Sequence, residues 1–234
     1  NLAMTIIDAR TLADNAEIQT DVCVVGSGAA GLPIVKELAN TPVDVCLLES
    51  GGMELDEDLQ TLSDFENVGR PMRPDYRTRL RQYGGTTHLW WGKCSLLNPI
   101  DFEPRPWVPH SGWPIRYADV VPYYQRAAEL LQVGNGSLQV FDPQVMAAQW
   151  NALEKEVVSS STMTPEITIW QPVELGATFR PALERFSRGD ATRYSRGVAT
   201  RSPNIRVYLH ANVTELEASE NSSTIERVQV ACLS

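Results

Sequence analysis

Residues 21–31 read DVCVVGSGAAG, an apolar run that ends in three glycines with the spacing G-x-G-x-x-G. The apolar residues before the first glycine predict a short buried strand, and residues 29–39 predict the helix that follows it. Gly26 permits a tight turn, Gly28 leaves no Cβ between backbone and ligand, and Gly31 permits close packing of helix on strand. Because phosphate binds well at the start of such a helix, the stretch predicts a dinucleotide site.

A second apolar run, residues 43–48, predicts a neighbouring strand that ends at Glu49. In a right-handed βαβ unit, this carboxylate lies at the tip of the strand, where it can accept hydrogen bonds from a ribose diol. Any glycine-rich loop would explain G-x-G-x-x-G alone. The strand, the helix, the second strand and the terminal Glu together favour an α/β, Rossmann-like nucleotide-binding domain.

The chain has 234 residues, of which 43% are hydrophobic, and its net charge is −9. A chain of this size can bury a sizeable core in one large domain or two small ones. The acidic balance and the lack of a lysine-rich run argue against nucleic acid or an anionic membrane as partner. No stretch approaches the roughly 18 consecutive apolar residues of a membrane span, and no secretory signal opens the chain, so we expect a cytoplasmic protein without a membrane span.

The four cysteines are Cys23, Cys46, Cys94 and Cys232, and no two of them have the spacing C-x-x-C. We therefore expect all four to be reduced and none to bind a metal. Cys23 and Cys46 fall in the two predicted buried strands, where a free thiol behaves as a small hydrophobe. Residues 54–64 are acidic but contain no His, which favours a solvated helix face over a metal site.

A second unusual stretch, residues 81–94, reads RQYGGTTHLWWGKC. Its two glycines allow the backbone to approach a ligand closely, and its two threonines supply hydroxyls. A buried aromatic packing corner is the alternative, but Gly-Gly-Thr-Thr has poor helix and strand propensity, so we favour a ligand-binding role. The candidate residues here are Gly84, Gly85, Thr86, Thr87, His88, Leu89 and Trp90. The five arginines of residues 67–81 could bind phosphate or surface carboxylates.

The remaining segments carry weaker patterns. Residues 5–20 form a polar lead-in, and the proline-rich residues 98–114 predict a stiff loop, in which His110 is more typical of a structural role. Pro122 is expected to open an amphipathic helix, and residues 204–217 and 224–231 predict a strand pair. The helix has apolar positions at Val121, Tyr124, Ala128 and Leu131. We thus predict a cofactor-binding domain over residues 17–134, a partial substrate or lid region over 135–202, and a return to the cofactor-binding domain over 203–234.

Taken together, the two glycine-rich stretches make the chain resemble the N-terminal half of glucose–methanol–choline (GMC) flavin oxidoreductases over residues 20–231. The first glycine motif is shared with every Rossmann flavoprotein. Residues 84–87, together with Asp-Phe-Glu at 101–103 and Ser-Gly-Trp-Pro at 111–114, are more specific. They resemble the bacterial sugar-oxidising branch, which includes enzymes like fructose dehydrogenase, pyranose oxidase and C-glycoside 3-oxidase.

The resemblance implies FAD as the cofactor. Some relatives attach FAD covalently through a His just after the Gly-Gly turn. Here an ungapped comparison puts Leu89 rather than His88 at that position, so we expect non-covalent FAD. The resemblance places Gly26, Ser27, Gly28 and Gly31 on the pyrophosphate, Glu49 on the adenosine ribose, Gly84 to Trp90 along the flavin side, and the backbone of Val213 against the adenine. Ser50, directly after Glu49, is a further cofactor-binding candidate.

The implied reaction is the oxidation of a CH–OH group of a sugar or glycoside, in which a base takes the hydroxyl proton while hydride passes to flavin N5. The family's base is a His near the C-terminus of a longer chain, and His88, His110 and His210 lie outside that motif. We therefore expect a fragment of a larger fold that has no catalytic residue of its own and needs its C-terminal remainder. The alternatives are a non-catalytic FAD-binding or interaction module and an NAD-dependent dehydrogenase, which would share only the first motif.

Overall fold

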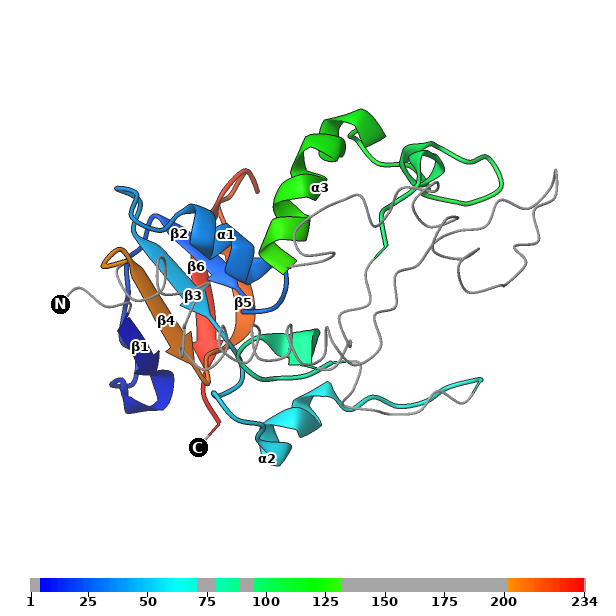
Figure 1. Ribbon diagram of the computed structural model, residues 1–234. Helices are drawn as coiled ribbons and strands as arrows, with labels where there is room; N and C mark the ends of the chain where they lie inside the picture. Colours follow the sequence, from blue (N-terminus) through cyan, green and yellow to red (C-terminus); the bar gives the residue numbers. More distant parts are fainter. Residues whose placement is uncertain (1–4, 71–78, 89–94, 132–201, 234) are drawn as a thin grey trace, which may run out of the picture. The chain divides into compact units, whose positions relative to one another are not determined.

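The computed structural model describes residues 5–70, 79–88, 95–131 and 202–233 (Figure 1). The chain divides into two compact units, one formed by Asn1–Trp90 with Arg180–Ser234 and the other by Trp91–Phe179. The described strands all belong to the first unit. The described part of the second unit contains the helix α3 (Tyr117–Leu131) and the 3-10 helix η5 (Pro99–Phe102).

A four-stranded parallel sheet forms the centre of the first unit. Its strand order is β1-β4-β3-β2, so β4 enters the sheet between β1 and β3. All four residues of β3 are buried, as expected for an inner strand of a parallel sheet that is covered on both faces. The structure thereby confirms the predicted α/β fold class. The strands are β1 (Thr5–Asp8), β2 (Val22–Val25), β3 (Val45–Leu48) and β4 (Ile205–Leu209).

The helix α1 (Gly31–Glu37) covers one face of this sheet (Figure 1). Leu32 and Val35 of the helix pack against Val24, Leu47 and Val207 of three different strands. Each strand contributes alternate residues to this cluster, because successive side chains of a strand point to opposite faces. The helix is shorter than the predicted span of residues 29–39, since turns flank it on both sides.

An antiparallel pair of strands packs on the other face. It consists of β5 (Asn212–Ala218) and β6 (Ile225–Ala231), which confirms the predicted hairpin. Val213 and Val228 of this pair pack against the cluster of Cys46, Leu48 and Tyr208. The sheet is therefore covered by a helix on one face and by a hairpin on the other.

Two of the strand predictions need correction. Residues 5–20 are not only a polar lead-in, because Thr5–Asp8 forms β1 and pairs in parallel with residues 206–209 of β4. Its partner lies at the far end of the sequence, so the local pattern gives little sign of the strand. Residues 204–217 are not one strand, because His210 has a φ of 57° and separates β4 from β5.

The second unit differs from prediction at its helix. α3 begins at Tyr117, and Pro122 lies inside it rather than at its start. The Asp119 carboxylate accepts a hydrogen bond of 2.9 Å from the Arg116 N–H, which caps the helix five residues before the proline. Of the predicted apolar positions, Ala128 is buried, whereas Val121 is 42% exposed. Phe102 of η5 contacts the ring of Tyr117 with centroids 5.8 Å apart.

Short helices complete the described residues. The acidic residues 54–64 were expected to form a solvated helix face, and they contain only the single turn of α2 (Glu57–Gln60) before η2 (Thr61–Ser63). Asp56 caps α2 by accepting hydrogen bonds from two backbone N–H groups. The other 3-10 helices are η1 (Ala9–Thr11) and η4 (Gly85–His88). No helix within the described ranges has the length and apolar character needed to cross a membrane.

Candidate nucleotide-binding site

The first glycine turn lies at the carboxyl ends of β2 and β3, the edge where parallel α/β sheets bind ligands. The Gly26 N–H donates a hydrogen bond of 2.7 Å to the Leu48 carbonyl, which fixes the start of the turn against β3. Gly26 has a φ of 90°, a conformation that side chains disfavour. A Cβ on Gly31 would overlap the carbonyl oxygen of Gly26. The local fold therefore requires glycine at positions 26 and 31.

Gly28 differs from these two glycines. A Cβ at this position would meet no atom within 4 Å, and the φ of the residue lies outside the left-handed region. Neither packing nor backbone conformation among the described residues therefore demands a glycine there. The open space above Gly28 leaves room for a ligand to approach the backbone.

Glu49 lies directly after β3 and is buried, with 5% of its surface exposed. Its Oε2 accepts hydrogen bonds from the Ser27 hydroxyl at 2.5 Å and from the Ser27 N–H at 2.9 Å. Its Oε1 accepts from the Gly51 N–H at 2.8 Å and from the Ser50 hydroxyl at 3.3 Å. These four neutral donors compensate a buried carboxylate and fix its orientation.

The second glycine stretch contacts the first. The Gly84 N–H donates a hydrogen bond of 3.0 Å to the Ser27 hydroxyl oxygen, and Ser27 is fully buried between the two loops. A Cβ on Gly85 would lie 3.4 Å from the Gly28 Cα. The structure thus brings both glycine-rich stretches and Glu49 together at one edge of the sheet.

The polar residues of the second stretch bind mainly to their own loop. The Thr87 hydroxyl donates to the Gly84 carbonyl at 2.5 Å, and His88 Nε2 lies 2.8 Å from the Tyr83 carbonyl oxygen. Thr86 is exposed. Thr87 and His88 therefore stabilise the turn of η4 in this structure. The predicted site residues Leu89 and Trp90 lie outside the described residues.

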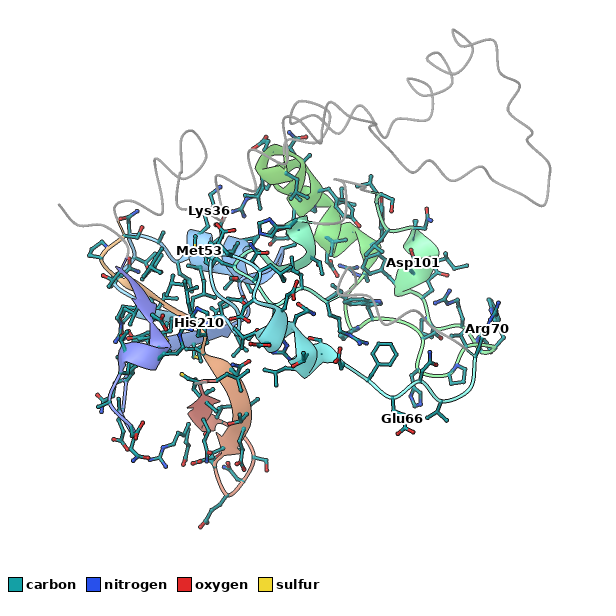
Figure 2. The ribbon with its side chains drawn as sticks, turned by 90° about the horizontal axis from the view of Figure 1, so that it is seen from below. Lys36, Met53, Glu66, Arg70, Asp101 and His210 are labelled. Carbon is teal, nitrogen blue, oxygen red and sulfur yellow. The ribbon has the colours of Figure 1, made fainter. Side chains whose placement is uncertain are left out.

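The turn between β4 and β5 is also tied to the Glu49 loop. The His210 N–H donates to the Gly51 carbonyl at 3.0 Å, and the Ala211 N–H donates to the Glu49 carbonyl at 2.8 Å. The His210 ring packs on Gly52, where a Cβ would meet ring atoms at 2.8 Å (His210 is labelled in Figure 2). Val213 follows this turn and packs half-buried on the sheet.

Arg81, one of the arginines that the sequence offered for phosphate or carboxylate binding, meets Asn212 in this region, and Asn212 was not predicted as a site residue. Arg81 Nη1 donates to Asn212 Oδ1 at 3.2 Å, and the Arg81 backbone carbonyl lies directly against Gly51. Asn212 Nδ2 and His210 Nδ1 are buried and have no hydrogen-bond partner in the described part of the chain. Such buried polar atoms without a partner indicate that a polar group can bind there. Asn212 carries no sequence signal of this role, because it is simply the first residue of β5.

Tyr83 lies beside this site, and its pKa is raised above the ordinary value of a tyrosine. Burial, and secondarily the negative charge of Glu49, raise the pKa of Tyr83 to about 12, so its phenol stays protonated at neutral pH. Within the described ranges, no group of three or more His, Cys, Asp or Glu side chains could hold a metal ion. The arrangement at this edge is therefore suited to binding and orienting a ligand.

No protein-family model matches the chain. Its two curated relatives are both named as oxidases. Over 129 residues, 50% of the chain, it is 32% identical to 6'''-hydroxyparomomycin C oxidase of Streptomyces lividus, covering 23% of that protein. Over 146 residues, 55% of the chain, it is 29% identical to paromamine 6'-oxidase of Streptomyces fradiae, covering 27% of that protein. The crystal structure of pyridoxine 4-oxidase from Mesorbium loti covers 92% of the chain and is itself covered to 46%, at 19% identity and a TM-score of 0.47. The matched regions span about a quarter of the length of each of the two curated relatives. The chain is therefore similar in sequence to part of two oxidoreductases.

Proposed function

We propose that the chain is the FAD-binding part of a GMC-family oxidoreductase that oxidises a CH–OH group of a sugar-like substrate. The observation that carries this proposal is the contact between the two glycine-rich stretches. Ser27 joins Gly84 to the buried carboxylate of Glu49, and Gly85 lies against Gly28. A dinucleotide fold of the NAD type would use the first glycine turn but gives no reason for the second loop to dock on it.

The residues at this edge fit an adenine dinucleotide. The open space at Gly28 suits a pyrophosphate, and the unpaired donor of Asn212 suits a polar group of the nucleotide. When bound, FAD supplies a two-electron acceptor for hydride. Ser27 donates both its N–H and its hydroxyl to Glu49, so its proposed role is to orient that carboxylate.

Glu49 would hold the adenosine ribose by exchanging one of its present donors. A carboxylate accepts about four hydrogen bonds, and Glu49 already accepts four. The hydroxyl of Ser50 makes the longest of these bonds, at 3.3 Å. Replacing it by a ribose hydroxyl would therefore cost less free energy than replacing any of the other three donors. In this proposal a ribose hydroxyl would take the place of the Ser50 hydroxyl on Glu49.

The names of the relatives guide the proposed substrate. Both curated relatives are oxidases of the paromomycin or paromamine type, and the alignments cover half or more of this chain. We therefore propose a hydroxyl group of an amino sugar or related glycoside as the site of oxidation. The base that takes the hydroxyl proton is proposed to be a His of the C-terminal remainder, and Leu89 at the linking position favours non-covalent FAD.

A titration with two nucleotides tests the proposal directly. The full-length protein that contains this chain is purified, its flavin content is measured, and the flavin-free form is titrated with FAD and with NAD⁺. We expect FAD to bind, NAD⁺ to bind far more weakly, and all of the flavin to be released when the protein is denatured. Anaerobic addition of paromamine or a related glycoside is expected to bleach the flavin absorbance. A full-length protein that neither contains nor takes up FAD would falsify the proposal.

A further inference from the structure

Two cysteines lie opposite each other in neighbouring strands. Cys23 of β2 and Cys46 of β3 are register partners in the parallel ladder. Adjacent strands lie about 4.8 Å apart, and a disulfide needs Cα atoms roughly 4.4–6.8 Å apart. Partners in a parallel ladder point to the same face, and both residues belong to the cluster around Leu48 and Tyr208. The fold therefore places two free thiols at a separation that a disulfide can span.

The two thiols differ in exposure and in acidity. Cys46 is 4% exposed, whereas Cys23 is half-buried and can be reached from solvent. A hydrogen bond from Cys46 lowers the pKa of Cys23 to about 7, and the same interaction raises the pKa of Cys46. At neutral pH, Cys23 therefore has a larger thiolate fraction than an ordinary cysteine, and the thiolate is the form that attacks oxidants, whereas Cys46 keeps its proton.

We propose that Cys23 and Cys46 are a site of reversible oxidation, in which a peroxide converts the two thiols to a disulfide. The Cys23 thiolate attacks one peroxide oxygen, the O–O bond breaks, and hydroxide leaves, giving a sulfenic acid at Cys23. The Cys46 sulfur then attacks the Cys23 sulfur. The S–S bond forms, the S–O bond breaks, and the hydroxyl leaves as water with the Cys46 proton. The two thiols lose two electrons, and hydrogen peroxide is reduced to water.

The position of the pair gives the oxidation a structural consequence. Cys23 and Cys46 each lie three residues before a site residue, namely Gly26 and Glu49 respectively. The bond would therefore lock together the two strands that position the glycine turn and the ribose-facing carboxylate. This inference concerns the chain's own thiols and does not depend on which nucleotide binds.

Cys232 is the matched control. It follows β6, is exposed, and has Asp8 and Arg10 as its charged neighbours; among the described residues no second thiol interacts with it. Partial desolvation raises the pKa of Cys232, so that less of it is thiolate at neutral pH. We expect Cys232 to remain alkylatable under conditions that oxidise the pair.

Peptide mapping of the full chain tests the proposal. The protein is treated with a small excess of hydrogen peroxide at neutral pH, its remaining thiols are alkylated, and it is digested without reductant. We expect the loss of two alkylatable thiols and one cross-linked peptide pair that contains Cys23 and Cys46, both reversed by dithiothreitol. Recovery of both cysteines as free thiols, or a bond from either of them to another cysteine, would overturn the proposal.

Two variants separate the attacking thiol from the resolving one. In Cys46→Ser, the sulfenic acid at Cys23 has no thiol to resolve it and is expected to accumulate, as measured by dimedone labelling. In Cys232→Ser, labelling and cross-linking are expected to match the wild type. Equal dimedone labelling at Cys23 in the wild type and in Cys46→Ser would contradict the proposal. Peptide mapping of the wild type decides the question even if a variant folds poorly.

Discussion

Ser27 and Glu49 are joined by a hydrogen bond of 2.5 Å between the serine hydroxyl and the carboxylate. The same hydroxyl oxygen accepts the Gly84 N–H, so the buried side chain of Ser27 connects the carboxylate after β3 to a loop residue 57 positions beyond Ser27 itself. Both loops meet at Ser27, and neither has a large side chain at the contact. The geometry of the candidate site therefore depends on one small hydroxyl.

Replacing Ser27 by Ala is expected to lower the free energy of unfolding by about 1–3 kcal/mol, because it leaves the Gly84 N–H buried without its acceptor and removes a donor from Glu49. Urea unfolding measures the change. The matched control is Ser50→Ala, which removes the 3.3 Å bond of a half-buried hydroxyl and is expected to lower stability by less than about 1 kcal/mol. Equal losses in the two variants would argue against the bridging role of Ser27.

The two glycines of the first turn are expected to respond differently to alanine. In Gly31→Ala the new Cβ overlaps the Gly26 carbonyl, so we expect a loss of about 3 kcal/mol or more in stability. In Gly28→Ala the methyl enters open space, so thermal unfolding should change little while FAD affinity falls. Thermal denaturation and FAD titration of both variants check this. Gly28→Ala unfolding as easily as Gly31→Ala would refute the distinction.

Glu49→Gln is expected to weaken FAD binding by about 10-fold or more, since hydrogen bonds to a charged group contribute about 1.5–3 kcal/mol. The amide has the shape of the carboxylate but presents N–H groups to donors such as the Ser27 and Gly51 N–H. Isothermal titration with FAD gives the affinity. Glu57→Gln, at an exposed position of α2, serves as the control and should bind FAD as the wild type does.

Tyr83 makes stability depend on pH in alkali. Its pKa is about 12 in the folded chain because of burial and of Glu49, against an ordinary value of 10.0. Below pH 10 its contribution to stability is fully present. Between pH 10 and about 12 the unfolded chain loses the proton that the folded chain keeps, so on the order of 2 kcal/mol is lost as pH rises.

The comparison of wild type with Tyr83→Phe measures this pH dependence. Urea unfolding at pH 8 and at pH 11 should show a steeper loss of stability for the wild type, because phenylalanine has no proton to release. Parallel losses in the two proteins would show that Tyr83 titrates normally. Glu49→Gln should in addition lower the pKa of Tyr83, since it removes the second cause of the shift.

The features that the sequence predicted correctly are local. The strand at Val22–Val25 matches its predicted bounds, and Glu49 follows β3 as expected. Both could be predicted because an apolar run that ends in a glycine turn or a carboxylate is a pattern of a few consecutive residues. The predicted hairpin is present for the same reason, since two strand patterns flank a short polar turn.

The features that the sequence did not predict depend on contacts between distant residues. β1 forms because the edge of β4 accepts it, and its four residues carry no pattern strong enough to show this alone. The docking of Gly85 on Gly28 and the bridge at Ser27 join loops that lie far apart in the chain. The backbone turn at His210 is a further example, since a positive φ is uncommon for any non-glycine residue and one His in a strand-like run does not announce it.

The strand order also bears on the order of synthesis. β3 and β4 are neighbours in the sheet, yet residues 49–204 must be made between them. At usual rates of translation this takes on the order of 10–30 s, during which β3 lacks its partner on one edge. Val45 and Leu47, both without exposed surface in the folded chain, are then uncovered on a strand with free N–H and C=O groups. The nascent chain therefore exposes an unpaired β-strand edge until residues 205–209 are available to cover it.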